Sequence, residues 1–198
     1  ILYSPGQSLI ESWPFKNIRD VQVHIIMPNA YHFMCVEAWC EHFPKTKLYA
    51  SELAISQLLA KKAFLASDNI LKLEEADPTV TSAYDILFPP GHRAGDVWLK
   101  RSTSDSSLWI TCDSFLNYDR LSNQPIARFM QKALGAAPGL KLSQVIKWFI
   151  LKDRRAFKRW ALAQSNKDKP STLIPSHGEV RQSKSLSLDI IKLLENRL

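Results

Sequence analysis

Four residues that can bind a metal each follow a short apolar stretch. They are His32, His92, Asp113 and His177, after residues 21–26, 86–88, 108–110 and 173–174. Strand ends commonly carry functional side chains, because loops vary there while the sheet holds them in place. Three imidazoles and one carboxylate suit zinc, iron or manganese. The pattern predicts a metal site, although five histidines in 198 residues are ordinary and a single histidine is more often structural.

The stretch around His32 has the pattern of a strand, a helix and a second strand. Residues 21–26 are mostly apolar and end before Pro28, as expected for a buried strand. A helix is expected next, ended by Pro44, and its apolar face consists of Phe33, Val36, Trp39, Cys40 and Phe43. A strand at residues 47–50 completes a unit of about 30 residues, the size of a parallel crossover. A further helix is expected from Ser51 to about residue 66.

From residue 70 onward the expected elements are shorter. Residues 97–100 and 108–111 flank a polar turn and predict a hairpin. Residues 125–164 have a helical pattern, which Pro138 and Gly139 divide into two helices. The second of these is expected to bury Val145, Trp148, Phe149, Phe157 and Trp160. A strand at residues 173–174 precedes an amphipathic helix at 186–194, whose inward side chains are Leu186, Ile190, Leu193 and Leu194. These elements predict the α+β class.

The order of the candidate ligands carries a resemblance to a known family. His32 follows a strand and opens a helix, His92 lies in Pro-Gly-His, Asp113 follows a strand, and His177 lies in Pro-Ser-His-Gly. This order resembles the metallo-β-lactamase-fold hydrolases, and among them a poorly characterised branch. The resemblance covers the chain and implies an αββα sandwich in one domain, residues 1–198. It further implies a helical insertion at 125–164 before the last strand, and N-terminal strands missing before Ile1.

The family's signature motif, of the form HxHxDH, is eroded in this sequence. Met27 and Asn29 stand where two histidines belong, and Tyr31 stands where an aspartate belongs. A centre with two metals is therefore not expected. The resemblance implies that at most one divalent metal binds (zinc, iron or manganese), with ligands drawn from His32, His92, Asp113 and His177.

Asp113 and Tyr31 are the candidate catalytic residues. The family aspartate that Tyr31 replaces helps to hold the attacking water, so its loss bears on hydrolysis itself. Tyr31 could instead donate a hydrogen bond to a developing oxyanion, or it could serve packing. Ser4 lies where many family members have an aspartate that supports the metal loop, and its presence implies that this support is missing.

Three functions remain open from the sequence. The first is a metal-dependent hydrolase that activates water for attack on an ester, thioester or phosphoester. The second is a catalytically inactive protein of the same fold that binds a ligand or partner. The third, which is the least expected, is a nucleic-acid-binding module built on residues 147–159, where basic side chains lie near Trp148 and Trp160.

Composition limits the cellular setting. The net charge is +7, and nine Lys or Arg lie between Lys141 and Lys169 against two Asp. Such a cluster could attract nucleic acid, anionic lipid or a phosphorylated substrate, or it could be a solvated helix face. No apolar run reaches the length of a membrane span. Three cysteines without metal-binding spacing favour a reducing, cytoplasmic compartment. The oligomeric state and the small-molecule substrate are not encoded in these patterns.

Overall fold

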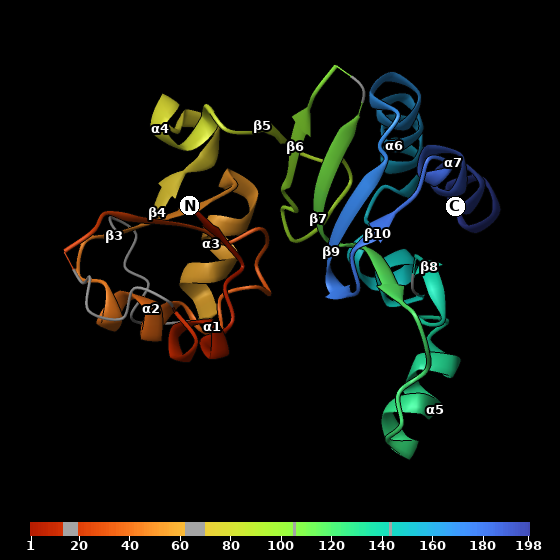
Figure 1. Cartoon of the computed structure of the whole chain (residues 1–198), viewed down its shortest axis with the longest axis horizontal. Helices are drawn as coiled ribbons and strands as arrows, with labels where there is room; N and C mark the ends of the chain where they lie inside the picture. The colour runs from red at the N-terminus through yellow and green to blue at the C-terminus, as the bar shows by residue number, and fades with distance from the viewer. Residues whose placement is uncertain (14–19, 62–69, 105, 143) are drawn as a thin grey trace. The chain divides into compact units, whose positions relative to one another are not determined.

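The computed structural model describes residues 1–13, 20–61, 70–104, 106–142 and 144–198, and the chain divides into two compact units, residues 1–83 and 84–198. In Figure 1 the first unit runs from red to yellow and the second from yellow-green to blue. Among the described residues, no helix has the length and apolar composition needed to cross a membrane.

The first unit is built on a parallel sheet. Its four strands follow the order β1-β2-β3-β4 and comprise Leu2–Tyr3, Val23–Ile26, Thr46–Ala50 and Ile70–Lys72. The expected parallel crossover is confirmed, since β2 and β3 pair in parallel with Ile25 opposite Leu48. The helices are α1 (Gln7–Glu11), α2 (Val36–His42), α3 (Glu52–Lys61) and α4 (Pro78–Thr81). The expected extension of α3 to residue 66 lies outside the described residues.

Aromatic side chains of α2 and its C-terminal end fill the core of the first unit. Trp39 and Phe43 are fully buried and stack with ring centroids 5.7 Å apart. Phe33 and Val36 are also buried, whereas Cys40 is half-buried at the edge of this face. Burying one large apolar side chain contributes about 1.5–3 kcal/mol. The apolar face of α2 therefore fixes the helix against the sheet that carries the His32 loop.

The second unit contains a mixed sheet. Its strands follow the order β10-β9-β7-β6-β5, and β8 pairs with β7. They comprise β5 Asp85–Leu87, β6 Trp98–Ser102, β7 Ser107–Tyr118, β8 Gly139–Lys141, β9 Thr172–Gly178 and β10 Arg181–Gln182. The predicted hairpin is confirmed by the antiparallel pairing of β6 with β7. Strand β9 lies on the other side of β7, and this pair is parallel.

The helices of the second unit are α5 (Pro125–Ala133), α6 (Arg154–Asp168) and α7 (Leu186–Arg197), with a π-helical segment at Ile146–Ile150. The core gathers Trp98, Trp109, Phe115 and Phe157 with the inner face of α7, where Leu186, Ile190 and Leu194 are fully buried as expected. A buried ion pair joins the sheet to α6: Lys100 Nζ, from strand β6, lies 3.2 Å from Oδ1 of Asp168 at the end of α6.

The segment 125–164 differs from the helical pattern that its sequence suggests. It includes the short strand β8, which pairs antiparallel with β7 and lacks the alternation that would reveal a strand. Trp148 and Phe149 were expected in the core and are instead 57% and 67% exposed. The expectation fails because helix α6 begins anew at Asp153, whose side chain accepts a hydrogen bond from the Ala156 amide. The residues before this cap therefore do not share a helical face with Phe157.

Candidate metal site

The loop that carries His32 is ordered by its own polar groups. Strand β2 ends at Ile26, and Met27 and Asn29 then turn into the interior, where both are fully buried. The Asn29 side chain accepts a hydrogen bond from the Tyr31 amide at 2.8 Å, and its carbonyl accepts one from the His32 amide at 3.3 Å. These bonds form a local turn. Asn29 therefore holds the shape of the loop that carries His32.

Ser4, directly after strand β1, supports the His32 imidazole. Its Oγ lies 2.7 Å from His32 Nδ1, and its amide bonds to Ile26 O at 3.0 Å. Ser4 has a φ of 46°, a conformation that non-glycine residues adopt rarely and often at functional positions. The inference that Ser4 leaves the loop without support is therefore wrong, because a hydroxyl can make the bond that a carboxylate makes. Nδ1 is engaged by Ser4, so a metal would bind His32 through Nε2.

Tyr31 makes a cation–π contact. Lys61 Nζ lies 4.1 Å from the centroid of the Tyr31 ring and donates a hydrogen bond to Ala30 O at 2.6 Å. Desolvation lowers the pKa of Lys61. This contact agrees with the packing interpretation of Tyr31, and its catalytic role stays a prediction.

Asp113 and His177 meet in the second unit, from strands 64 residues apart in sequence. Asp113 Oδ1 lies 3.1 Å from His177 Nε2, and the two side chains are 13% and 48% exposed. The sequence suggested that each residue follows its strand. Both instead lie within a strand, Asp113 in β7 and His177 in β9. The pairing of these strands is irregular between Thr111 and Leu116, so Asp113 lies within a bulge. Bulges redirect side chains and are frequent beside functional sites.

The Asp113–His177 pair joins an acidic side chain to a histidine that is about half exposed to solvent. The hydrogen bond from His177 to Asp113 raises the pKa of His177, against an opposing effect of burial. Cys112, the neighbour of Asp113, is fully buried, and burial raises the pKa of its thiol well above the usual value. A carboxylate and an imidazole that meet at a half-exposed position form a candidate His/Asp site for a divalent metal.

Gly178 and Asn117 position the His177 backbone through the pairing of β9 with β7, and neither was among the site residues expected from the sequence. Gly178 has a φ of +99°, and a Cβ there would lie 1.9 Å from Asn117 O. The Asn117 side chain donates a hydrogen bond to Glu179 O at 2.9 Å. The close approach requires glycine after the histidine. The sequence Pro-Ser-His-Gly shows that a glycine follows the histidine, but it does not show which strand lies against that glycine.

His92 is paired with a different carboxylate. Its Nε2 lies 3.7 Å from Asp96 Oδ2, and both side chains are fully buried. Asp96 Oδ2 also accepts hydrogen bonds from Ser114 Oγ at 2.6 Å and from Trp98 Nε1 at 3.1 Å. Neither ring nitrogen of His92 has a hydrogen-bond partner among the described residues. The structure thus places His92 beside Asp96 and His177 beside Asp113, so a ligand role for His92 remains a prediction.

The remaining histidines have structural surroundings. The His24 ring stacks on Tyr49 with centroids 5.6 Å apart, and His24 Nδ1 lies 3.1 Å from Tyr49 Oη. His42 lies in the last turn of α2, where the helix dipole favours a positive charge. Neither surrounding requires a metal.

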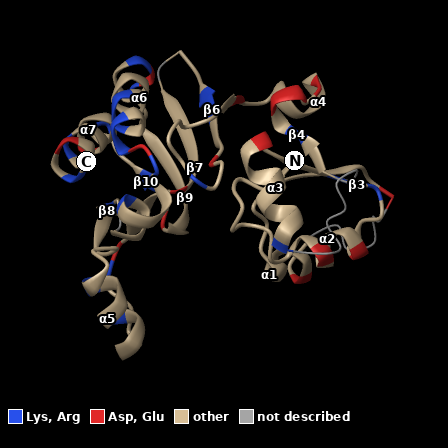
Figure 2. Ribbon diagram, turned by 180° about the vertical axis from the view of Figure 1, so that it is seen from behind, with Lys and Arg blue, Asp and Glu red and all other residues tan. Residues whose placement is uncertain are grey.

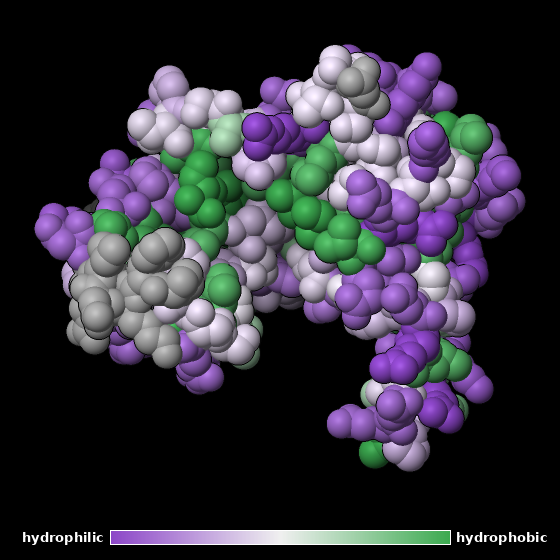
Figure 3. Space-filling model, in the orientation of Figure 1, coloured by the Kyte–Doolittle hydropathy of each residue, from purple (hydrophilic) through white to green (hydrophobic). Residues whose placement is uncertain are grey.

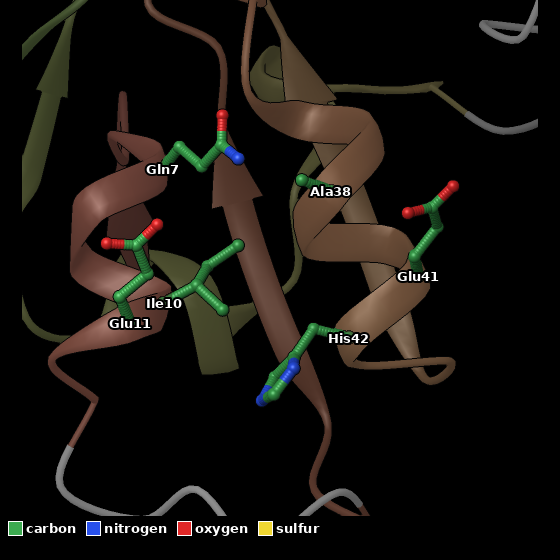
Figure 4. A pocket seen from close by; sticks show the side chains of 6 residues that line it. All are labelled: Gln7, Ile10, Glu11, Ala38, Glu41 and His42. Atoms are coloured by element: carbon green, nitrogen blue, oxygen red, sulfur yellow. The ribbon is translucent and has the colours of Figure 1, made fainter.

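A pocket of about 260 Å³ lies between α1 and α2 in the first unit. Figure 4 shows its lining, which is Gln7, Ile10, Glu11, Ala38, Glu41 and His42. The Glu11 and Glu41 carboxylates project from different helices and do not converge (Figure 4). None of the predicted ligands lines this pocket, and its side chains do not form a metal-binding set.

Comparison with known proteins identifies the fold. No family model matches the sequence, and no curated protein does. Solved structures match well: a metallo-beta-lactamase from Pontibacter korlensis has a TM-score of 0.59 at 14% identity, over 98% of this chain and 79% of that one. The metal-soaked Flv1 flavodiiron core from Synechocystis gives 0.57 at 15%, over 98% and 49%. The metallo-beta-lactamase FIM-1 from Pseudomonas aeruginosa in its mono-zinc form gives 0.52 at 13%, over 96% and 73%. The expected α+β class is confirmed, and the chain has the metallo-β-lactamase fold.

Proposed function

We propose that this protein is a metal-dependent hydrolase with a single divalent metal. The observation that supports it most directly is the Asp113–His177 pair, with 3.1 Å between potential ligand atoms. His32 is the third proposed ligand, from its place in the family's order of motifs and from the Ser4 contact that orients its ring. His92 is the fourth, and it would have to exchange its contact with Asp96 for the metal. Among proteins of this fold, one carries a single zinc and another is a flavodiiron core.

The donor set fits one metal and not two. His32, His177 and Asp113 supply two imidazoles and a carboxylate, which match zinc, iron or manganese and leave room for His92 and for water or substrate. The positions of the family's other two histidines hold Met27 and Asn29, both fully buried. A thioether and an amide that pack in the interior do not replace two imidazoles. The proposal is therefore limited to one metal.

Different residues of this chain would have different roles around that metal. A bound divalent ion supplies a Lewis acid and lowers the pKa of water towards neutrality. Ser4 holds His32 through Nδ1, which leaves Nε2 of that imidazole for the metal, and Asp113 and His177 would exchange their mutual hydrogen bond for the metal. Tyr31 would donate a hydrogen bond to the oxyanion once its ring leaves Lys61. The substrate class is an ester, thioester or phosphoester. A cytoplasmic location is proposed because no disulfide joins the three cysteines, all of which are described.

The second candidate is a catalytically inactive protein that binds a small ligand or a partner on the same fold. It is favoured by the buried Met27 and Asn29, and by Tyr31 in place of the family's aspartate. In this case the Asp113–His177 hydrogen bond would have a structural role only. Stability and metal content should then be unchanged when His177 is replaced.

Metal analysis separates the two candidates. Protein purified without chelators or a nickel-binding tag, and supplied with zinc, iron or manganese, should hold about one metal per chain. His177→Ala and His32→Ala should each lower this to below about 0.2. His24→Ala is the matched control, since His24 stacks on Tyr49 and should leave the content unchanged. A wild-type value below about 0.2 with every metal would refute the proposal. The loaded protein is then assayed with nitrophenyl esters, thioesters and phosphoesters.

A further inference from the structure

Helix α5 is amphipathic, and its apolar face is not packed. Ile126, Phe129 and Met130 recur at the i, i+3, i+4 spacing of one helical face. They are 80%, 69% and 46% exposed, and no residue of α5 is buried. Figure 1 shows α5 extending away from the sheet of its own unit, and Figure 3 shows hydrophobic and hydrophilic side chains on its surface. Exposed apolar faces of this kind mark interaction sites.

The opposite face of α5 and the residues around it are basic. Arg128 and Lys132 are one helical turn apart and lie away from the apolar face. Residues 120–152 contain six Lys or Arg and no Asp or Glu. Figure 2 shows basic and no acidic positions along α5. Whatever covers this region is therefore expected to be apolar and negatively charged at once.

The π-helical segment adds exposed aromatic side chains beside the end of α5. The Gln144 amide bonds to Leu134 O at 2.9 Å, which joins the start of this segment to the C-terminus of α5. The Gln144 side chain accepts a hydrogen bond from Trp148 Nε1 at 2.9 Å. The Arg154 guanidinium lies 4.4 Å from the centroid of the exposed Trp148 ring. A tryptophan with a cation on its face is the kind of side chain that settles at the boundary between lipid headgroups and acyl chains.

We propose that α5, with Trp148 and Phe149, is a peripheral binding site for an anionic lipid bilayer. The apolar face would enter the region between headgroups and acyl chains, and the basic side chains would contact acidic headgroups. This mode needs no membrane-spanning helix. It is independent of the proposed metal site, because none of the proposed ligands belongs to it.

Two other occupants fit the observations less well. In a symmetric dimer the same surface meets itself, so the basic stretch of one copy would face that of the other without an acidic residue between them. A nucleic acid would use the basic groups and could stack on Trp148. It offers nothing, however, to the aliphatic side chains of Ile126 and Met130, which are the exposed face of α5.

Vesicle co-sedimentation tests the proposal with the whole chain. Vesicles of phosphatidylcholine with about 30% phosphatidylserine should bind the protein, and pure phosphatidylcholine should bind it at least tenfold more weakly. Arg128→Gln with Lys132→Gln should weaken binding roughly thirtyfold, given the usual attraction of each basic residue to an acidic surface. Phe129→Ser should weaken it about tenfold or more. Leu188→Ser is the matched control, because Leu188 is also largely exposed (60%, against 69% for Phe129) but lies on α7, and it should change binding less than twofold.

Depth and alternative partners are read in the same samples. Brominated lipids should quench tryptophan emission, and Trp148→Phe should abolish most of that quenching while keeping an apolar ring at the position. The substituted side chains are exposed, so circular dichroism should show unchanged folding in every variant. Three results would overturn the proposal. They are equal binding to neutral and acidic vesicles, a dimer in solution that Phe129→Ser dissociates without any vesicle binding, and oligonucleotide binding that needs the basic residues while vesicles are ignored.

Discussion

Replacing Gly91 by alanine should destabilise the second unit far more than the same replacement at Gly139. Both glycines have nearly the same left-handed backbone, with φ of +75° and +77°. A Cβ on Gly139 meets nothing within 4 Å, whereas a Cβ on Gly91 would lie 2.2 Å from the carbonyl oxygen of Asp153. Gly139→Ala therefore measures the cost of the backbone conformation alone, and Gly91→Ala adds a collision with a neighbouring backbone.

The size of the difference follows from the bonds that the collision would break. The left-handed conformation costs an alanine about 1 kcal/mol, which applies to both variants. The Gly91 carbonyl accepts hydrogen bonds from the Lys152 and Asp153 amides at 2.8 and 3.1 Å, and the Arg93 amide bonds to Ile150 O at 2.9 Å. A net backbone bond contributes about 1 kcal/mol, so losing two or three of them brings the total for Gly91→Ala to roughly 3–4 kcal/mol.

Urea unfolding measures both variants. Tryptophan emission reports on both units, because Trp39 is fully buried in the first unit and Trp98 and Trp109 are fully buried in the second, and circular dichroism at the same urea concentrations checks that the two probes agree. The expected free energies of unfolding differ by about 2–3 kcal/mol between Gly91→Ala and Gly139→Ala. A difference below about 0.5 kcal/mol would show that the loop before His92 does not hold α6 as described.

Three further predictions concern single residues. Lys100→Met should lower the free energy of unfolding in urea by about 3 kcal/mol, because Asp168 stays buried without its ion pair. Adding Asp168→Leu should restore most of that stability, and a double variant without any recovery would contradict the pairing. Ser4→Ala should weaken zinc binding about 10–100-fold in competition with a chelating dye, with Ser8→Ala as the exposed control; equal affinities would remove Ser4 from the site. Desolvation, followed by the charge of Lys47, lowers the pKa of His24, so folding favours the neutral ring. This contribution to stability is present above pH about 6.5 and is lost as the pH falls below that value. His24→Gln should therefore lessen the drop in melting temperature between about pH 7.5 and 5.

Much of the local structure could be predicted because short-range patterns control it. Apolar spacing and Pro44 located α2, and the polar turn between two apolar stretches located the hairpin of β6 and β7. The inner face of α7 was correct for the same reason. Trp148 and Phe149 show the limit of this reasoning. The apolar spacing continues across the N-cap of α6 at Asp153, so it placed residues before the cap on a helix face to which they do not belong.

The sequence alone determined which residue types are present for chemistry, in what order, and on which local elements, since spacing and turn residues act over a few positions. Tertiary structure alone decided which of them meet. Asp113 and His177 come together through parallel pairing of β7 with β9 and a bulge in that pairing, and Ser4 reaches His32 through the pairing of β1 with β2. His92 lies beside Asp96 in the interior for the same kind of reason. Strand partners and register depend on how the whole chain buries its apolar surface, and no short stretch of sequence carries that information.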